Sequence, residues 1–191
     1  VGFKELEGIH SRTDFDLSQH QKVSGKKVQY YDAELNESYV PYVIETSIGL
    51  DRMFLSVLSA SYSEEMAPTA DGKEEQRTVM RIPPALAPVK AAVLPLTRKD
   101  GLPDIARSII AALKYDFNCY YEEKDSIGRR YRRQDAIGTP FCITVDHQTK
   151  EDETVTLRHR DTMEQERVKI ASLNKIVGEK VSMKKLLKNL E

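Results

Sequence analysis

Strand-like and helix-like patterns alternate between residues 91 and 145, and this alternation constrains the fold more than any other feature. Short apolar runs typical of buried strands are separated by two segments with the 3.6-residue period of a helix, in the order 91–96, 102–113, 117–122, 126–137 and 141–145. Such alternation is typical of a sheet whose strands are parallel in part. Residues 154–158 and 167–170 add a predicted hairpin, and a last helix is expected over residues 171–190, broken near Gly178. The prediction is a mixed five-stranded α/β domain.

The N-terminal part of the chain predicts a smaller set of elements. Short strands and one short helix are expected, in the order 3–9, 13–20 with Thr13 as the helix N-cap, 28–31 and 40–45. Residues 47–61 form a broadly apolar helical pattern, so we expect most of this helix to be buried. Residues 64–76 contain Pro68, Gly72 and several charges, which predict a loop or partly disordered link. The predicted organisation is a first domain, a linker and a second domain, over residues 1–63, 64–84 and 85–191.

The junction between the strand at 40–44 and the following helix gathers polar groups. Glu45 stands at the predicted strand end, Ser47 at the helix start, Gly49 in the first turn and Arg52 one turn further on. A helix N-terminus attracts anions, a carboxylate attracts an amine, and a guanidinium can stack on a base or bind phosphate. By spacing alone the junction favours a helix cap with a surface salt bridge, with a ligand site as the alternative.

Composition excludes several classes of protein. Lys and Arg total 29 against 30 Asp and Glu, which excludes a bulk polycation but leaves room for a local basic face. Cys119 and Cys142 form no Cys-x-x-Cys pair and the four histidines have no ligand spacing, so no zinc is expected. No apolar run approaches a membrane span and no secretory signal is present, so we expect a cytoplasmic protein. Because the chain begins at Val1, we expect it to be a piece of a longer protein.

The junction resembles motif 3 of the class II aminoacyl-tRNA synthetases, and its flanks resemble the glycyl-tRNA synthetases. The matching flanks are residues 2–12, 81–88, 126–140 and 160–165, of which Ser-Ile-Gly-Arg-Arg-Tyr-Arg-Arg-Gln-Asp-Ala-Ile-Gly-Thr-Pro at 126–140 is the most specific. The resemblance implies that residues 1–63 are the end of an antiparallel catalytic sheet. It also implies that residues 85–191 are an anticodon-binding domain.

Roles for residues of the first domain follow from this resemblance. It implies that Arg52 stacks on the adenine of ATP and that Glu45 and Ser47 recognise glycine, with Gly49 leaving room for the ligand. Arg52 and Glu45 are the implied catalytic residues, while Glu5 and Arg12 match positions near ATP. Magnesium is expected to arrive with ATP, near Glu5, rather than in a cage made by the protein alone.

Five arginines are candidates for contact with tRNA. Arg129, Arg132 and Arg133 share one face of the helix predicted at 126–137, because three- and four-residue spacings do so. The alternative is a solvated helix face that is partly paired with nearby aspartates. Arg158 and Arg160 lie at a predicted strand end, where an exposed base could be met.

The expected function of the intact protein is that of a glycine–tRNA ligase. It would use ATP and magnesium to activate glycine and transfer it to the tRNA for glycine, as a homodimer. Motifs 1 and 2 of the class are not found in these residues, so the chain alone is expected to be inactive. The alternatives are a noncatalytic synthetase-like accessory protein and a free-standing RNA-binding module.

Overall fold

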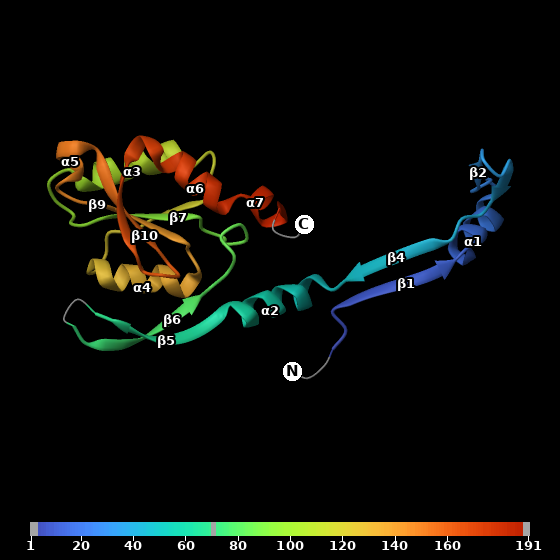
Figure 1. The fold of residues 1–191 in the computed structure, drawn as a ribbon, viewed down its shortest axis with the longest axis horizontal. Helices are drawn as coiled ribbons and strands as arrows, with labels where there is room; N and C mark the ends of the chain where they lie inside the picture. Colours follow the sequence, from blue (N-terminus) through green and yellow to red (C-terminus); the bar gives the residue numbers. More distant parts are fainter. Residues whose placement is uncertain (1–3, 70–71, 189–191) are drawn as a thin grey trace. The chain divides into compact units, whose positions relative to one another are not determined.

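The computed structural model describes residues 4–69 and 72–188, and its contacts divide the chain into two compact units. The first unit spans residues 1–57 and the second spans residues 58–191 (Figure 1). Phe3, expected in the first strand, and Leu190, expected in the last helix, lie outside the described residues. Each unit is described by itself.

The second unit is built on a five-stranded mixed sheet. Its strand order is β11-β10-β9-β7-β8, with bounds β7 Ala91–Pro95, β8 Cys119–Tyr121, β9 Phe141–Val145, β10 Thr154–His159 and β11 Gln165–Lys169. Strand β7 runs parallel to both β8 and β9, while β10 is antiparallel to β9 and β11. The mixed five-stranded α/β prediction is therefore confirmed.

Helices cover both faces of this sheet, and β7 shows why. Along β7, Ala91 and Val93 join the larger apolar core with α3 (Leu102–Leu113) and α6 (Leu173–Val181). Ala92 and Leu94, which point the other way, pack with residues of α4 (Ile127–Ile137), so α3 and α4 lie on opposite faces (Figure 1). The remaining helical segments are short: α5 Thr149–Asp152, a 3-10 turn Ile170–Ser172 and α7 Met183–Lys188.

The last two helices differ from the single helix expected over residues 171–190. The break falls at Ser182, between α6 and α7, rather than near Gly178, which continues α6. None of the helices in the described ranges combines the length and the apolar character that crossing a membrane demands.

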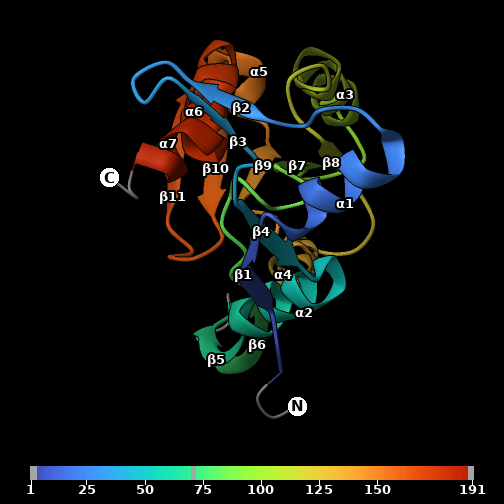
Figure 2. The same ribbon diagram turned by 90° about the vertical axis from the view of Figure 1, so that its right-hand side faces the viewer.

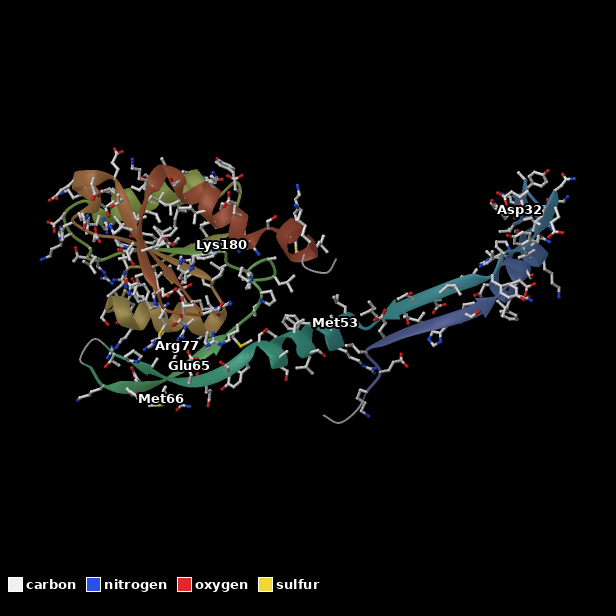
Figure 3. All side chains as sticks on the ribbon, viewed as in Figure 1. Asp32, Met53, Glu65, Met66, Arg77 and Lys180 are labelled. Atoms are coloured by element: carbon white, nitrogen blue, oxygen red, sulfur yellow. The ribbon has the colours of Figure 1, made fainter. Side chains whose placement is uncertain are left out.

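Residues 64–76 are not the loop or disordered link that the sequence predicts. They belong to an antiparallel hairpin of β5 (Tyr62–Pro68) and β6 (Glu74–Met80), in which Glu65 pairs with Arg77. Ala67, Arg77 and Val79 are buried, whereas Met66 on the other side of the hairpin is exposed (Figure 3). One of the charged residues that suggested a loop, Glu65, instead pairs with Arg77 across the hairpin, and Arg77 also contacts Asp135 of α4.

The first unit contains two small antiparallel pairs of strands, one complete helix and the first part of a second helix. Strand β1 (Glu7–Thr13) pairs with β4 (Val43–Ile48), which lie side by side in Figure 2, and β2 (Tyr30–Asp32) pairs with β3 (Glu37–Tyr39). Helix α1 (Phe15–Ser24) has Asp14 at its N-cap rather than Thr13, which is the last residue of β1 and has a φ of 55°. Helix α2 (Leu50–Ser61) likewise starts at Leu50 and not at Ser47, which is a strand residue.

The expected burial of α2 is wrong for this chain. Leu50 is 79% exposed and Phe54 is 63% exposed, and Ser61 is the buried residue of the helix. Both apolar core clusters of the described residues lie in the second unit. A two-stranded pair such as β1–β4 offers no second layer that could cover an apolar helix.

Gly138, which ends α4, provides a test of the packing between α4 and the strand β6. It has a φ of 84°, and an added Cβ would lie 3.1 Å from the backbone oxygen of Met80 and from Ile82 Cδ1. Gly101 has a similar φ of 76° with open space around it. We expect Gly138→Ala to lower the free energy of unfolding by about 2–4 kcal/mol, from left-handed backbone strain plus the clash.

The matched variant Gly101→Ala carries the backbone strain alone and should cost about 1–2 kcal/mol. Urea unfolding of both variants measures the difference. Equal losses in the two variants would contradict the close packing of Gly138 against β6.

Candidate functional site

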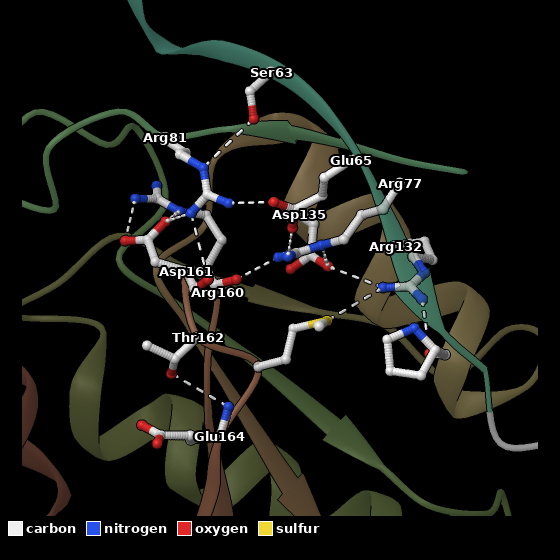
Figure 4. Close-up of polar contacts among 12 residues, drawn as sticks. Ser63, Glu65, Arg77, Arg81, Arg132, Asp135, Arg160, Asp161, Thr162 and Glu164 are labelled. Atoms are coloured by element: carbon white, nitrogen blue, oxygen red, sulfur yellow. Dashed lines mark hydrogen bonds and ion pairs between the residues drawn. The ribbon is translucent and has the colours of Figure 1, made fainter. Parts of the chain in front are cut away.

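A buried carboxylate on α4 organises the polar interior of the second unit. Asp135 is fully buried, and its Oδ2 lies 2.8 Å from Nε of Arg77 (Figure 4). Its Oδ1 lies 2.8 Å from Nη1 of Arg158. A second bond of 3.0 Å joins Arg158 Nη2 to Oδ2. Arg77 also donates to Glu65 at 2.5 Å. These bonds fasten the hairpin β5–β6 to α4 and β10.

The network continues to the turn after β10. Arg160 donates to the carbonyl oxygens of Ile82 and Gly138, both at 2.8 Å, and to the Asp161 carboxylate. Burial alone would raise the pKa of Asp161, but the hydrogen bonds from Arg160 and the charge of Arg81 lower the pKa below its ordinary value. Arg160 is therefore a structural crosslink between separate segments of the chain.

Arg158 and Arg160 are thus not the exposed side chains that the sequence predicts at this strand end. Both are buried, and their guanidinium groups are committed to Asp135, Asp161 and backbone carbonyls. The sequence analysis also missed Arg77 as a member of this network. Residues 74–80 show no alternation of apolar and polar residues, so no local pattern marks this strand in the sequence.

A pocket of about 540 Å³ opens between α4, the sheet and the end of the hairpin. Its lining comes from α4 (Ile127, Gly128, Tyr131, Arg132), the sheet (Thr144, Thr156, Arg158, Gln165), the hairpin end (Pro68, Thr69), and Leu96, Asp146 and Met163. The pocket lies beside the carboxyl ends of the parallel strands β7 and β9 and the N-terminal half of α4, which is where ligands bind in many α/β sheets.

The pocket offers an aromatic ring, a guanidinium and several hydrogen-bonding groups. Tyr131 shares a 2.6 Å hydrogen bond with Thr144, and the Arg158 guanidinium stacks 4.7 Å from the Tyr131 ring centre. Burial raises the pKa of Tyr131, so its hydroxyl stays protonated. Flat surfaces and fixed donors of this kind suit an unpaired nucleic-acid base.

Arg132 is the arginine of α4 that faces this pocket. Its side chain is 26% exposed, and its contacts to Pro68 O (3.3 Å), Met163 Sδ (3.7 Å) and Asp135 Oδ2 (3.9 Å) are all long (Figure 4). A guanidinium has five N–H donors, so Arg132 keeps donors that a ligand can take.

The other two arginines predicted on the same helix face have different environments. Arg133 is paired with Glu122 at 2.6 Å and with Asp125 at 3.0 Å, and the hydrogen bond with Glu122 raises the pKa of Arg133. Arg129 is exposed, and among the described side chains it makes no ion pair. The solvated-face alternative therefore describes Arg133, whereas Arg132 lines the pocket.

In the first unit, β1 and β4 bring Arg12 and Glu45 together. Arg12 Nε lies 3.5 Å from Glu45 and 2.8 Å from Asp16, and the hydrogen bond from Arg12 lowers the pKa of Asp16. Glu45 and Ser47 are two residues apart on β4, where they pair with His10 and Gly8 of β1. Both side chains therefore lie on the same face of the strand pair. The ion pairs of the described residues join Glu45 to Arg12 and not to Arg52.

Arg52 is held by the other end of the same strand pair. Its Nη1 donates to the backbone oxygen of Glu5 at 2.5 Å, and Gly49 N donates to Leu6 O at 3.3 Å. A Cβ on Gly49 would meet only Arg52, at an ordinary 3.5 Å, so the packing of the chain does not itself require glycine there. Among the described residues there is no group of three or more acidic, histidine or cysteine side chains that could hold a metal ion.

Comparison with known proteins gives these sites a family context. Residues 90–180 match the family described as the anticodon binding domain. The chain is 52% identical over 178 residues to the glycine–tRNA ligase of Thermobifida fusca, covering 93% of this chain and 38% of that protein. It is 54% identical over 176 residues to the glycine–tRNA ligase of Clostridium perfringens, covering 92% of this chain and 37% of that protein.

The chain therefore spans a little over a third of the length of the curated relatives that it matches. These relatives are aminoacyl-tRNA synthetases by name, so the resemblance to the glycyl-tRNA synthetases is confirmed, whereas the match of the junction to motif 3 stays a prediction. Along nearly its whole length the chain is a homologue of the glycine–tRNA ligases, and its residues 90–180 match the anticodon-binding family.

Proposed function

We propose that this chain is part of a glycine–tRNA ligase and that its second unit binds the anticodon loop of the tRNA for glycine. The observation that supports this function is the pocket beside Tyr131 and Arg132, two residues that lie within the segment matching the anticodon-binding family. Anticodon bases are unpaired, so their faces and edges are open to stacking and hydrogen bonding. Arg132 supplies donors, Gln165 and Thr156 line the pocket, and Arg129 adds an exposed positive charge on the same helix.

The first unit contributes ATP and glycine binding. Glycine presents only an ammonium and a carboxylate, so its ammonium is read by a carboxylate, the role of Glu45 with Ser47 beside it. Arg12, close to Glu45 and Asp16, supports the charge balance of this surface. Arg52 holds the adenine end through its planar guanidinium.

ATP-bound magnesium needs few protein ligands. Magnesium usually keeps several waters and binds one or two carboxylates together with substrate phosphates. The exposed carboxylate of Glu5 meets that requirement, whereas a cage of three or more protein ligands is not found in the described ranges. The ion neutralises charge on the phosphates when ATP is bound.

The intact ligase acts as a homodimer in the cytoplasm.

Replacing Arg132 tests the RNA site. We expect Arg132→Gln to weaken binding of an RNA stem-loop carrying the glycine anticodon by about tenfold, since a base-reading arginine contributes roughly 1–3 kcal/mol. The same variant should lose discrimination against a stem-loop with changed anticodon bases. Binding is measured at two salt concentrations, because phosphate contacts depend strongly on salt.

Arg129→Gln is the matched control for this prediction. It removes an exposed charge from the same helix, so it should weaken both stem-loops equally and reduce the salt dependence. If the unaltered protein binds both stem-loops equally well, the generic RNA-binding alternative is the better description of the chain.

Replacing Arg52 in the intact ligase tests the nucleotide site. We expect Arg52→Ala to slow glycine-dependent exchange of pyrophosphate into ATP by at least about tenfold, which corresponds to a loss of about 1.4 kcal/mol of transition-state stabilisation. Stem-loop binding should stay unchanged. Arg107→Ala removes an exposed arginine of α3 and should leave both measurements unchanged. Normal exchange in the Arg52 variant would contradict the assigned role.

The chain by itself should not activate glycine. The described residues supply Glu45 and Arg52 but span a little over a third of the relatives' length. We therefore expect no glycine-dependent pyrophosphate exchange above background from this chain, at concentrations where the intact ligase is active. Measurable exchange would show that these residues form a complete activation site.

A further inference from the structure

Three guanidinium groups surround one carboxylate in the second unit, and they do not share it equally. Asp135 Oδ2 accepts from Arg77 Nε at 2.8 Å and from Arg158 Nη2 at 3.0 Å. Arg132 Nη1 stays 3.9 Å from the same oxygen, beyond hydrogen-bond length. Arg77 and Arg158 therefore occupy the acceptor sites that Arg132 would otherwise take.

The exclusion of Arg132 from Asp135 leaves it available to the pocket. Its other contacts, 3.3 Å to Pro68 O and 3.7 Å to Met163 Sδ, are long and involve uncharged acceptors. A guanidinium beside a buried carboxylate with a free lone pair forms a short charge-assisted bond. Arg132 keeps its present position because that lone pair is already used.

Arg77, which donates to this lone pair of Asp135 Oδ2, comes from the hairpin β5–β6. Arg77 is fully buried on β6, and the same hairpin contributes Pro68 and Thr69 to the pocket lining. All three residues lie outside residues 90–180, the part of the chain that matches the anticodon-binding family. The hairpin thus supplies both a wall of the pocket and the competitor for Asp135.

Building on the proposed function, we propose that the hairpin β5–β6 is a component of the RNA-reading site, in which Arg77 is a positioning residue that holds Asp135 and leaves Arg132 free to read an unpaired base. Arg132 donates to acceptor atoms on the edge of that base. Loss of the Arg77 charge lets Arg132 close onto Asp135 Oδ2 and withdraw from the pocket. Arg77 then sets specificity without touching RNA.

A double-mutant cycle in the intact ligase tests this arrangement. The variants are Arg77→Met, Arg132→Gln and the pair, each titrated with the glycine anticodon stem-loop and its base-changed counterpart. Arg132→Gln should weaken anticodon binding about tenfold in the unaltered protein. In the Arg77→Met background the same substitution should change affinity by less than about twofold, because Arg132 has already left the base.

Two further variants of Arg77 separate its charge from its packing. Arg77→Gln is also neutral but polar, so it should reproduce the Arg77→Met cycle even if the methionine variant folds poorly. Arg77→Lys keeps a cation near Oδ2, and it should restore the large effect of Arg132→Gln together with base discrimination. Rescue by lysine is not expected of a residue whose role is packing alone.

Glu65→Gln is the control for loss of stability in the hairpin. It removes the second carboxylate partner of Arg77 and leaves the contact between Arg77 and Asp135 in place. We expect a lower melting temperature with the full effect of Arg132→Gln retained.

If Arg132→Gln costs the same in the Arg77→Gln background as in the unaltered protein, the positioning role is overturned. If Arg132→Gln has no effect in the unaltered protein, the proposed anticodon function itself fails.

Discussion

The second unit depends on the ionic contacts of one buried carboxylate. Asp135 joins α4 to β10 through Arg158 and to the hairpin through Arg77, with short bonds and no exposure to solvent. Removing one member of such a buried pair leaves an uncompensated charge, which typically costs about 3–5 kcal/mol. The hairpin has little apolar surface of its own in this contact, with Ala67 and Val79 as its buried apolar residues. The position of the hairpin against α4 therefore depends on ionic contacts more than on buried apolar area.

The two faces of the five-stranded sheet differ in how much apolar packing they contain. The face under α3 and α6 contains a large apolar cluster, whereas the face under α4 has a small one built from Ala92, Leu94 and Cys142. Burial raises the pKa of the Cys142 thiol to about 12, as expected for a cysteine packed as a small apolar residue. The polar network and the pocket occupy the remaining area of the α4 face. One face is therefore stabilised by apolar packing, and the other combines a buried ionic network with the pocket.

The elements that have a local sequence pattern were predicted correctly. The elements and side-chain positions that depend on partners far along the chain were not. The strands and helices from residue 91 to residue 145 follow from periodicity and from Gly138, which adopts the left-handed conformation that ends α4. The hairpin was missed because its charges, above all Arg77, are satisfied by residues far along the chain, and a charged residue is ordinarily read as exposed. For the same reason Arg158 and Arg160 were expected at the surface. Ser47 was placed in a helix because its pairing with Gly8 of β1 is not visible in local sequence.

The two ends of helix α2 are held by contacts with different parts of the chain. Its first turn carries Arg52, which is held by the backbone oxygen of Glu5 in the first unit. Its last residue, Ser61, is followed directly by β5, and its carbonyl accepts a 2.6 Å hydrogen bond from Arg81 N at the end of the hairpin. Arg81 in turn pairs with Glu65, the partner of Arg77. The end of α2 therefore depends on the ionic network around Asp135, whereas the position of Arg52 depends on the strand pair β1–β4.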